Sequence, residues 1–342
     1  MIRFCKILAV LLLLPLFGSG QMVDTSFRQA SFVEFSSEND LYQIALKADK
    51  EFTNGLSLRV GDQAFRNLGT RWLAIPMKSG VREYAWSISQ DMYTPEDIRN
   101  TEVDTTDRPY CGLLYLTFSA YSTDWNKGRR WTSELQVGIQ GPAAGAKQTQ
   151  NWLHSNTNNW IVEGWDNQIG NGLLLDYRIS VQDIITKNIS YLESSTFATL
   201  QVGTMRNFVA VGLQNKIGWF NSSYANFGGL QNRNQPRNQE VKASNGDRTV
   251  FLNRPWQAYL VADIGVSTIF YDGTTQGSLI PFEESVYTLD PAQITRFNAI
   301  SRLGISLSYG RTQLSYLWVV TGYQVRYSNL IGWGEFRLSV SL

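Results

Sequence analysis

Apolar and polar residues alternate along several stretches of this chain. The clearest stretches are 114–121, 135–140, 175–182 and 303–309, where aliphatic and aromatic residues are separated by single polar or small ones. Successive side chains of a β-strand point to opposite faces, so a period of two predicts strands with one apolar and one polar face. The same alternation continues through 336–342, the last residues of the chain.

The pattern predicts twelve strands in all. Their expected ranges are 29–38, 54–63, 82–91, 112–122, 131–140, 172–183, 190–203, 207–217, 256–268, 296–309, 312–322 and 334–342. An even number of strands with charged residues on the polar face is typical of bacterial outer-membrane barrels, in which closure gives every backbone amide a partner. We therefore predict an all-β, transmembrane antiparallel β-barrel that closes its last strand on its first. A secreted soluble β-sandwich is the alternative.

The first twenty residues have the features of a secretory signal peptide. A basic start with Arg3 and Lys6 precedes an apolar run at 7–17 and three small residues at 18–20. That run is too short to cross a bilayer, which takes about 20 residues as a helix. We expect cleavage near residue 20 and a barrel formed by residues 21–342. Only Cys111 would then remain, so no internal disulfide is expected.

The predicted topology places six connections outside the cell. With the N-terminus in the periplasm, they fall near 39–53, 92–111, 141–171, 204–206, 269–295 and 323–333. Periplasmic turns of such barrels are short. One connection violates this rule, because 218–255 would be a long periplasmic segment. Either it forms a plug or flap, or the alternation of strand direction fails there.

The composition limits the kinds of partner that the protein is expected to bind. The formal net charge is +1, which argues against a nucleic-acid ligand. Aromatic residues make up 13% of the chain, which fits the aromatic girdles of a membrane barrel. No other segment approaches the length of a transmembrane helix. We expect a monomer in the outer membrane.

Three polar clusters are predicted at the outer ends of the first six strands. They are 38–40 with 51–56, 89–97 with 107–112, and 141–168. The third contains His154, the single histidine of the chain. A barrel needs no histidine for stability, and histidine is the side chain whose ordinary pKa lies nearest neutrality. His154 is therefore the best candidate for a proton carrier, although an ordinary hydrogen-bonded loop residue is the simpler interpretation.

In these clusters the chain resembles the lipid A 3'-O-deacylase family of outer-membrane barrels. The resemblance rests on the order and spacing of short motifs, each of which is weak alone. They are Glu38-Asn39-Asp40, Phe52-Thr53-Asn54-Gly55-Leu56, Thr94-Pro95-Glu96-Asp97-Ile98, Asp107-Arg108-Pro109-Tyr110 with Gly112, Gly141-Pro142, Gln150-Asn151 with His154, and Gly164-Trp165-Asp166-Asn167-Gln168.

The resemblance implies a 12-stranded esterase that removes the acyloxyacyl group from the 3' position of lipid A and requires calcium. Carried across by motif, His154 matches the general base, Asn39 and Asp40 match an Asn-Asp pair, and Thr53 matches a hydroxyl residue. The expected partner is lipid A, or lipopolysaccharide, in the outer leaflet. Asp40 either orients the imidazole or binds the metal. Thr53 either acts as a nucleophile or positions an activated water, and we favour the water.

The sequence departs from the family pattern in several places, two of which concern the site. A further acid of the family site has no secure match, and Glu163 is the nearest candidate for a metal ligand beside Asp40. A family lysine also lacks a match, with Arg99 or Arg108 as possible replacements. Other functions remain open: a porin or structural barrel, a phospholipase on the same fold, or a receptor or adhesin. The motifs also have plain structural interpretations as turns, caps and, for Asp107-Arg108, an ion pair.

Overall fold

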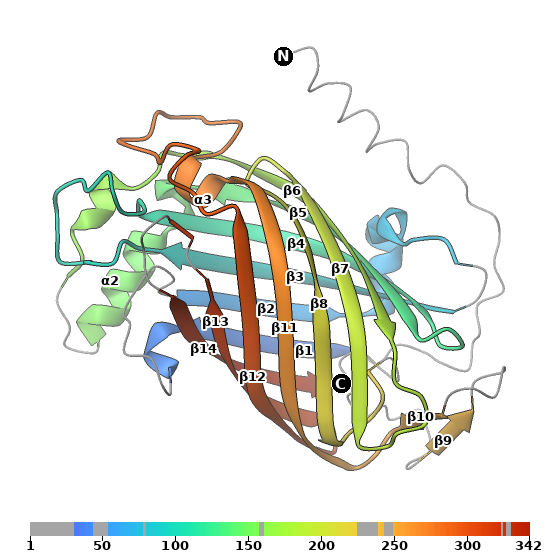
Figure 1. The fold of residues 1–342 in the computed structure, drawn as a ribbon. Coiled ribbons are helices and arrows are strands. Elements are labelled where there is room, and N and C mark those ends of the chain that lie inside the picture. The colour runs from blue at the N-terminus through green and yellow to red at the C-terminus, as the bar shows by residue number, and fades with distance from the viewer. Residues whose placement is uncertain are drawn as a thin grey trace.

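The computed structural model describes residues 31–43, 54–77, 80–156, 161–223, 239–242, 249–322, 324–325 and 330–342. Twelve of the strands in these ranges form one closed antiparallel barrel (Figure 1). Each strand pairs with its neighbours in sequence, with two exceptions. β1 pairs with β14, and β8 pairs with β11 because β9 and β10, which lie between them in the sequence, form a separate two-stranded sheet. The alternating pattern along the chain therefore predicted the correct fold class.

The observed strands agree closely with the predicted ranges. The largest extension is at the outer end of β11, where the register shifts between Ile269 and Tyr271 and the strand continues to Asp272. The barrel strands are β1 (Phe32–Asn39), β2 (Asn54–Gly61), β3 (Val81–Tyr93), β4 (Cys111–Asp124), β5 (Arg129–Gln140), β6 (Gly172–Ile184), β7 (Leu192–Gly203), β8 (Arg206–Trp219), β11 (Trp256–Asp272), β12 (Phe297–Tyr309), β13 (Thr312–Thr321) and β14 (Ile331–Ser341). The separate sheet consists of β9 (Gln239–Lys242) and β10 (Thr249–Leu252).

The first and last strands close the barrel. They pair from Phe32 opposite Ser341 to Asn39 opposite Gly334, as the apolar final strand predicted. Apolar residues such as Phe35, Leu58 and Leu338 are exposed on the outer face. Because no sheet edge is left in the barrel wall, its backbone groups are satisfied within the wall.

The polar faces of the strands line the lumen and pair their charges there. Arg59 lies 3.5 Å from Glu34, and Arg178 lies 3.5 Å from Glu134. Arg337 is paired with Glu335 on its own strand. Burying such charges is costly unless they are paired and hydrogen-bonded. The charged residues on the polar faces of the strands are therefore paired at these three arginines.

The outer mouth of the barrel is filled by side chains from the outer loops. Arg108 is fully buried, with its guanidinium 4.5 Å from the centre of the Tyr93 ring. It donates to Thr274 and Gln324 at 3.1 and 2.9 Å. Thr274 belongs to the short helix α3 (Gly273–Gln276), whose first carbonyl accepts a hydrogen bond from Gln140. Loops that are distant in sequence thus close this end of the lumen.

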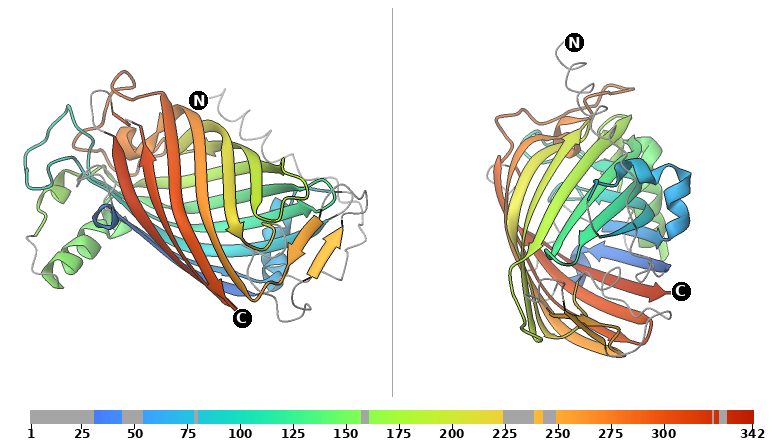
Figure 2. Two further views of the ribbon diagram at one scale, coloured as in Figure 1. Left: turned by 60° about the horizontal axis from the view of Figure 1, so that its bottom comes forward. Right: turned by 90° about the vertical axis from the view of Figure 1, so that its right-hand side faces the viewer.

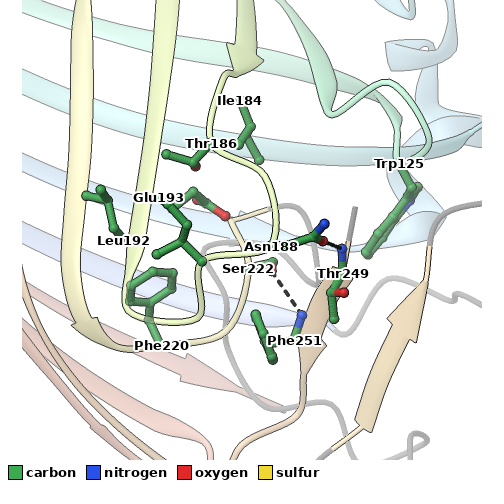
Figure 3. A pocket seen from close by; sticks show the side chains of 11 residues that line it. Trp125, Ile184, Thr186, Asn188, Leu192, Glu193, Phe220, Ser222, Thr249 and Phe251 are labelled. Carbon is green, nitrogen blue, oxygen red and sulfur yellow. Dashed lines mark hydrogen bonds between the residues drawn. The ribbon is translucent and has the colours of Figure 1, made fainter. Parts of the chain in front are cut away.

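The connection between β8 and β11 is the one that was predicted to break the short-turn rule. Strand direction alternates correctly through it, so the connection between β8 and β11 does lie at the inner end (Figure 2). Phe220 and Leu252 are buried there, and Arg254 donates to the Phe220 carbonyl at 2.9 Å. A cavity lies beside them, where Asn188 and Ser222 accept the backbone N–H groups of 249 and 251 (Figure 3). The described part of this segment therefore packs against the inner ends of β7 and β8 and the turn between β6 and β7.

Short helical segments lie at both ends of the barrel wall. At the outer end lie η1 (Asp40–Tyr42), η4 (Pro142–Ala144), α2 (Ala146–Asn156) and η5 (Gly164–Asn167), and at the inner end η2 (Gln63–Leu68) and η3 (Thr70–Leu73). No helix in the described ranges is long and apolar enough to span a bilayer. Residues 1–20, the predicted signal peptide, lie outside the described residues.

Candidate functional site

A row of buried residues crosses the outer end of four neighbouring strands. Asn39, Asn54, Met92 and Gly112 lie opposite one another from β1 to β4. They alternate in phase with Phe35, Leu58, Ile88 and Leu116, so they point out of the barrel, toward lipid. Those four apolar residues are 45 to 48% exposed, whereas Asn39 and Asn54 are only 7% exposed and Met92 is fully buried. Other segments of the chain therefore cover the outer face of the wall along this row.

The helix α2 provides part of that cover. A β-carbon added to Gly112 would lie 2.6 Å from the β-carbon of Ala146, so the absence of a side chain lets the helix start directly on the wall. Gln90, which also points outward from β3, donates to the Ala144 carbonyl at 2.7 Å. Gly145 precedes the helix with φ +73°, a conformation that favours glycine. The beginning of α2 is therefore fixed against β3 and β4.

His154 lies on the same side of α2 as Ala146 and Gln150. Residues four apart share one face of a helix, so Ala146, Gln150 and His154 form a single stripe. Ala146 and Gln150 are buried, and His154 is half-buried. In Figure 1 the helix lies beyond the outer end of the wall, and its contacts with the wall are mainly to β3 and β4.

Residues 162–165 pack against the side of α2 that carries Ala146 and Gln150. Trp165 is fully buried and donates its indole N–H to Gln150 Oε1. Asn151 accepts the Val162 N–H at 2.9 Å and donates to the Val162 carbonyl at 3.3 Å. The Tyr110 ring packs 5.0 Å from Trp165, and burial raises the pKa of the Tyr110 phenol. Trp165 is thus a structural support of the helix and not a membrane-interface tryptophan.

The Asn39-Asp40 pair forms a rigid corner where β1 ends. Asn39 Oδ1 accepts the Leu41 N–H at 2.8 Å and caps η1. That bond fixes the orientation of the amide, because only its oxygen can accept from an N–H, so the Nδ2 donor faces the other way. Asp40 is 6% exposed.

The other side of the corner packs on β13 and β14. Tyr42 lies against Gly334, where an added β-carbon would come within 2.5 Å of the Tyr42 β-carbon, and Tyr316 donates to the Tyr42 carbonyl at 2.6 Å. Two glycines, Gly334 and Gly112, therefore receive the covering segments, and the two amides Asn39 and Asn54 lie between them.

The remaining predicted site residues fall in different places. Thr53 lies outside the described residues, although Asn54 beside it is at the start of β2. Glu163 is exposed immediately before η5. Arg108 points into the barrel mouth, on the other side of the wall from Asn39, so it does not replace the missing lysine in this row. Its contacts with Tyr93 and Thr274 give it a structural role, without an Asp107–Arg108 ion pair among the contacts described.

The predicted calcium site does not assemble from the part of the chain that the structure describes. Calcium takes six to eight oxygen ligands. Within the described ranges, no three His, Cys, Asp or Glu side chains are grouped as metal ligands. Asp40 and Glu163 are contributed by separate segments, at the end of β1 and ahead of η5. We therefore derive no step through a metal.

Sequence reasoning missed two residues of the covered row, Asn54 and Gly112, and Gly334 beside the row. Asn54 was treated as part of a turn, and Gly112 and Gly334 received no role of their own. The only available signal was the phase of Asn54 with Leu56 and Leu58, which marks it as outward-facing. That phase alone does not predict burial.

These features define an outer-membrane β-barrel whose covered polar site lies on the lipid side of its outer rim. A family model described as "Outer membrane protein LpxR" matches residues 7–342, and the chain belongs to this family, the lipid A 3'-O-deacylase family that its motifs resemble. Among solved structures, LpxR from Salmonella typhimurium is similar with a TM-score of 0.69 and 17% identity, over 91% of this chain and 100% of that one.

A more distant likeness is the beta domain of the Bordetella autotransporter BrkA, with a TM-score of 0.42 and 9% identity over 92% of this chain and 99% of that one. A comparison with curated proteins found no match. Family membership places the protein in the outer membrane, in a family that acts on lipid A.

Proposed function

We propose that the protein is an ester hydrolase that removes the acyloxyacyl chain from the 3' position of lipid A. The observation that carries the proposal is the pair of buried amides, Asn39 and Asn54, on the lipid side of the outer rim, in the same row of strand ends on which α2, the helix of His154, begins. A lipid in the outer leaflet reaches that side without leaving the membrane. Its ester, near the headgroup, lies at the depth of the rim.

In the proposed reaction His154 is the general base. It takes a proton from a water whose oxygen attacks the ester carbonyl, and such a base contributes about 10²–10⁴-fold. The bond from the carbonyl carbon to the sugar oxygen then breaks, and the imidazolium returns its proton to that sugar hydroxyl. Asp40 orients the imidazole, and Thr53 positions the water.

The tetrahedral intermediate carries negative charge on the former carbonyl oxygen. Asn39 Nδ2 is the proposed donor to this oxyanion, since Leu41 holds the amide oxygen. Asn54 lies directly opposite Asn39 and is equally buried, so it is the proposed second donor. Two fixed amide donors in a site without bulk water stabilise developing charge more than water does.

The porin alternative has less support. The outer mouth is filled by Arg108, α3 and an apolar cluster that includes Tyr93, Met205 and Ile331. A conducting barrel needs an open lumen instead. No observation favours the phospholipase, receptor or adhesin alternatives, and the assay below separates the first of these.

Mass spectrometry of lipid A from cells that express the wild type, His154→Ala or Asn39→Ala tests the proposal. We expect loss of the 3' acyloxyacyl mass only with the wild type, while all three proteins remain heat-modifiable barrels. Purified wild type should release no fatty acid from glycerophospholipids. An unchanged lipid A pattern with folded wild type in the presence of calcium contradicts the proposal.

The same assay examines calcium, which the family resemblance implies. Adding a calcium chelator to purified protein, and then restoring calcium or magnesium, should abolish activity and recover it with calcium alone. Full activity in the chelator would leave the hydrolase proposal intact and remove calcium from it.

A further inference from the structure

The connection between β2 and β3 is unusually long for the inner end of the barrel. It covers residues 62–80, whereas β4 and β5 are joined by 125–128 and β12 and β13 by 310–311. Its helical turns η2 and η3 fold back over the outside of the wall and contact β3, β4 and β5 (Figure 2). We call the described part of this connection, residues 62–77, the inner ledge.

Aromatic packing fixes the inner ledge to the wall. Phe65 stacks on Trp86 with ring centres 4.6 Å apart, and the Trp86 indole donates to Thr70 at 2.7 Å. Ala74 packs with Tyr84 and Ala120. Trp86 and Tyr84 alternate with Glu83, which is paired with Arg130 in the lumen, so they point toward lipid. The inner ledge is therefore a rigid structure on the membrane side of the barrel.

The inner ledge lies where the hydrocarbon region gives way to headgroups. The next outward residue of β3 after Trp86 is Ile88, about 7 Å along the strand, and it belongs to the exposed apolar band. On the opposite wall, Trp256 and Tyr309 are exposed at the inner ends of β11 and β12, as expected for an interfacial aromatic girdle. Over β3–β5 the inner ledge takes the place of that girdle.

The surface of the inner ledge is both apolar and basic. Leu68 is 61% and Trp72 58% exposed, and the Arg71 guanidinium lies 4.9 Å from the Trp72 ring centre. Arg66 and Arg71 are exposed, and the stretch 63–80 contains no acidic residue. Exposed leucine and tryptophan beside arginines are the composition of surfaces that bind anionic lipid headgroups.

We propose that the inner ledge binds anionic glycerophospholipids of the periplasmic leaflet. Leu68 and Trp72 insert among the upper acyl carbons, and Arg66 and Arg71 contact the phosphates. The bilayer is favoured over a protein partner because the inner ledge is fixed to the lipid-facing side of the wall, at the edge of the apolar band. This contact anchors the inner end of the wall whose outer end carries α2.

The position of the inner ledge can be measured with a fluorescent label. Cys111 is fully buried, so Leu68→Cys in a Cys5→Ser background offers one accessible thiol. In vesicles of phosphatidylcholine and phosphatidylglycerol, we expect shallow doxyl lipids to quench this label strongly and aqueous iodide to quench it weakly. The matched control is Lys127→Cys, in the exposed β4–β5 turn, where iodide should dominate. Equal iodide quenching at both positions, with no lipid quenching at 68, overturns the proposal.

Headgroup selectivity is tested by native mass spectrometry of the protein released from mixed micelles. We expect the wild type to retain phosphatidylglycerol over phosphatidylcholine. The Arg66→Gln/Arg71→Gln variant should lose about fivefold of this preference per arginine, equivalent to about 1 kcal/mol for each charge, and Lys127→Gln should lose none. An unchanged preference in the double variant overturns the proposal. Because neither arginine lies near α2, lipid A deacylation should be unaffected, so failure of this test and failure of the proposed function are distinguishable.

Discussion

Two segments cover the same part of the barrel wall from opposite ends, and the side chains buried at the two ends differ in polarity. At the inner end, the inner ledge buries aromatic rings and one hydroxyl that accepts a tryptophan N–H. At the outer end, α2 packs on β3 and β4 and η1 packs on β14, and the row between them contains the buried amides of Asn39 and Asn54.

Burying an amide is costly unless it is hydrogen-bonded, whereas burying an aromatic ring is favourable. The inner end is therefore organised for stability. The outer end places polar groups where packing alone would have selected apolar ones. Such local departures from stable packing are expected at functional sites.

Among substitutions that compare the two ends of the wall, the largest effect should come from removing the second amide of the row. Asn54→Leu keeps the volume and the outward direction but deletes the donor, so deacylation should fall about 10²–10³-fold, as for the loss of one oxyanion donor. Kinetics on purified lipid A should show the loss in kcat. Leu58→Val, two outward positions further along β2, is the matched control. Full activity of Asn54→Leu would show that the buried amide of Asn54 takes no part in the reaction.

A smaller loss is expected when the helix is displaced from the wall. Gly112→Val puts a branched side chain where Ala146 now lies, so α2 must move outward. A shift of about 1 Å in a catalytic group costs up to roughly 10²-fold, and we expect at least a tenfold fall in kcat/KM with the barrel still heat-modifiable. Leu116→Val on the same face of β4 should be neutral. Wild-type activity in Gly112→Val would separate α2 from the reaction.

The smallest effect should be on the inner ledge. Thr70→Val removes the acceptor of the Trp86 indole and leaves a buried donor unsatisfied. The free energy of unfolding should fall by about 1–3 kcal/mol, measured by urea titration in detergent, and deacylation should be unchanged. An activity loss as large as that of Gly112→Val would show that the two ends of the wall are coupled.

The strands, their directions and the closure of β14 on β1 were all predictable from the sequence. A period of two is a local property, since each side chain's face depends only on its neighbours along the strand. The order of the strands, counted from this local pattern, also predicted that His154, Asn39 and Asp40 lie at the outer end of the barrel. It also assigned the connection between β8 and β11 to the inner end, where its described parts lie, although the length of this connection left the alternation of strand direction in question.

The sequence by itself therefore determined which residues point out and at which end of the barrel each one lies. Only the tertiary structure decided which of them are covered. Asn54 and Leu58 have the same phase on β2, yet only Asn54 is buried. Likewise Arg108, a possible site cation by motif, turns into the lumen toward Tyr93. The reason is physical: cover at the rim depends on the paths of loops from distant parts of the chain, and no local pattern records where those loops come to rest.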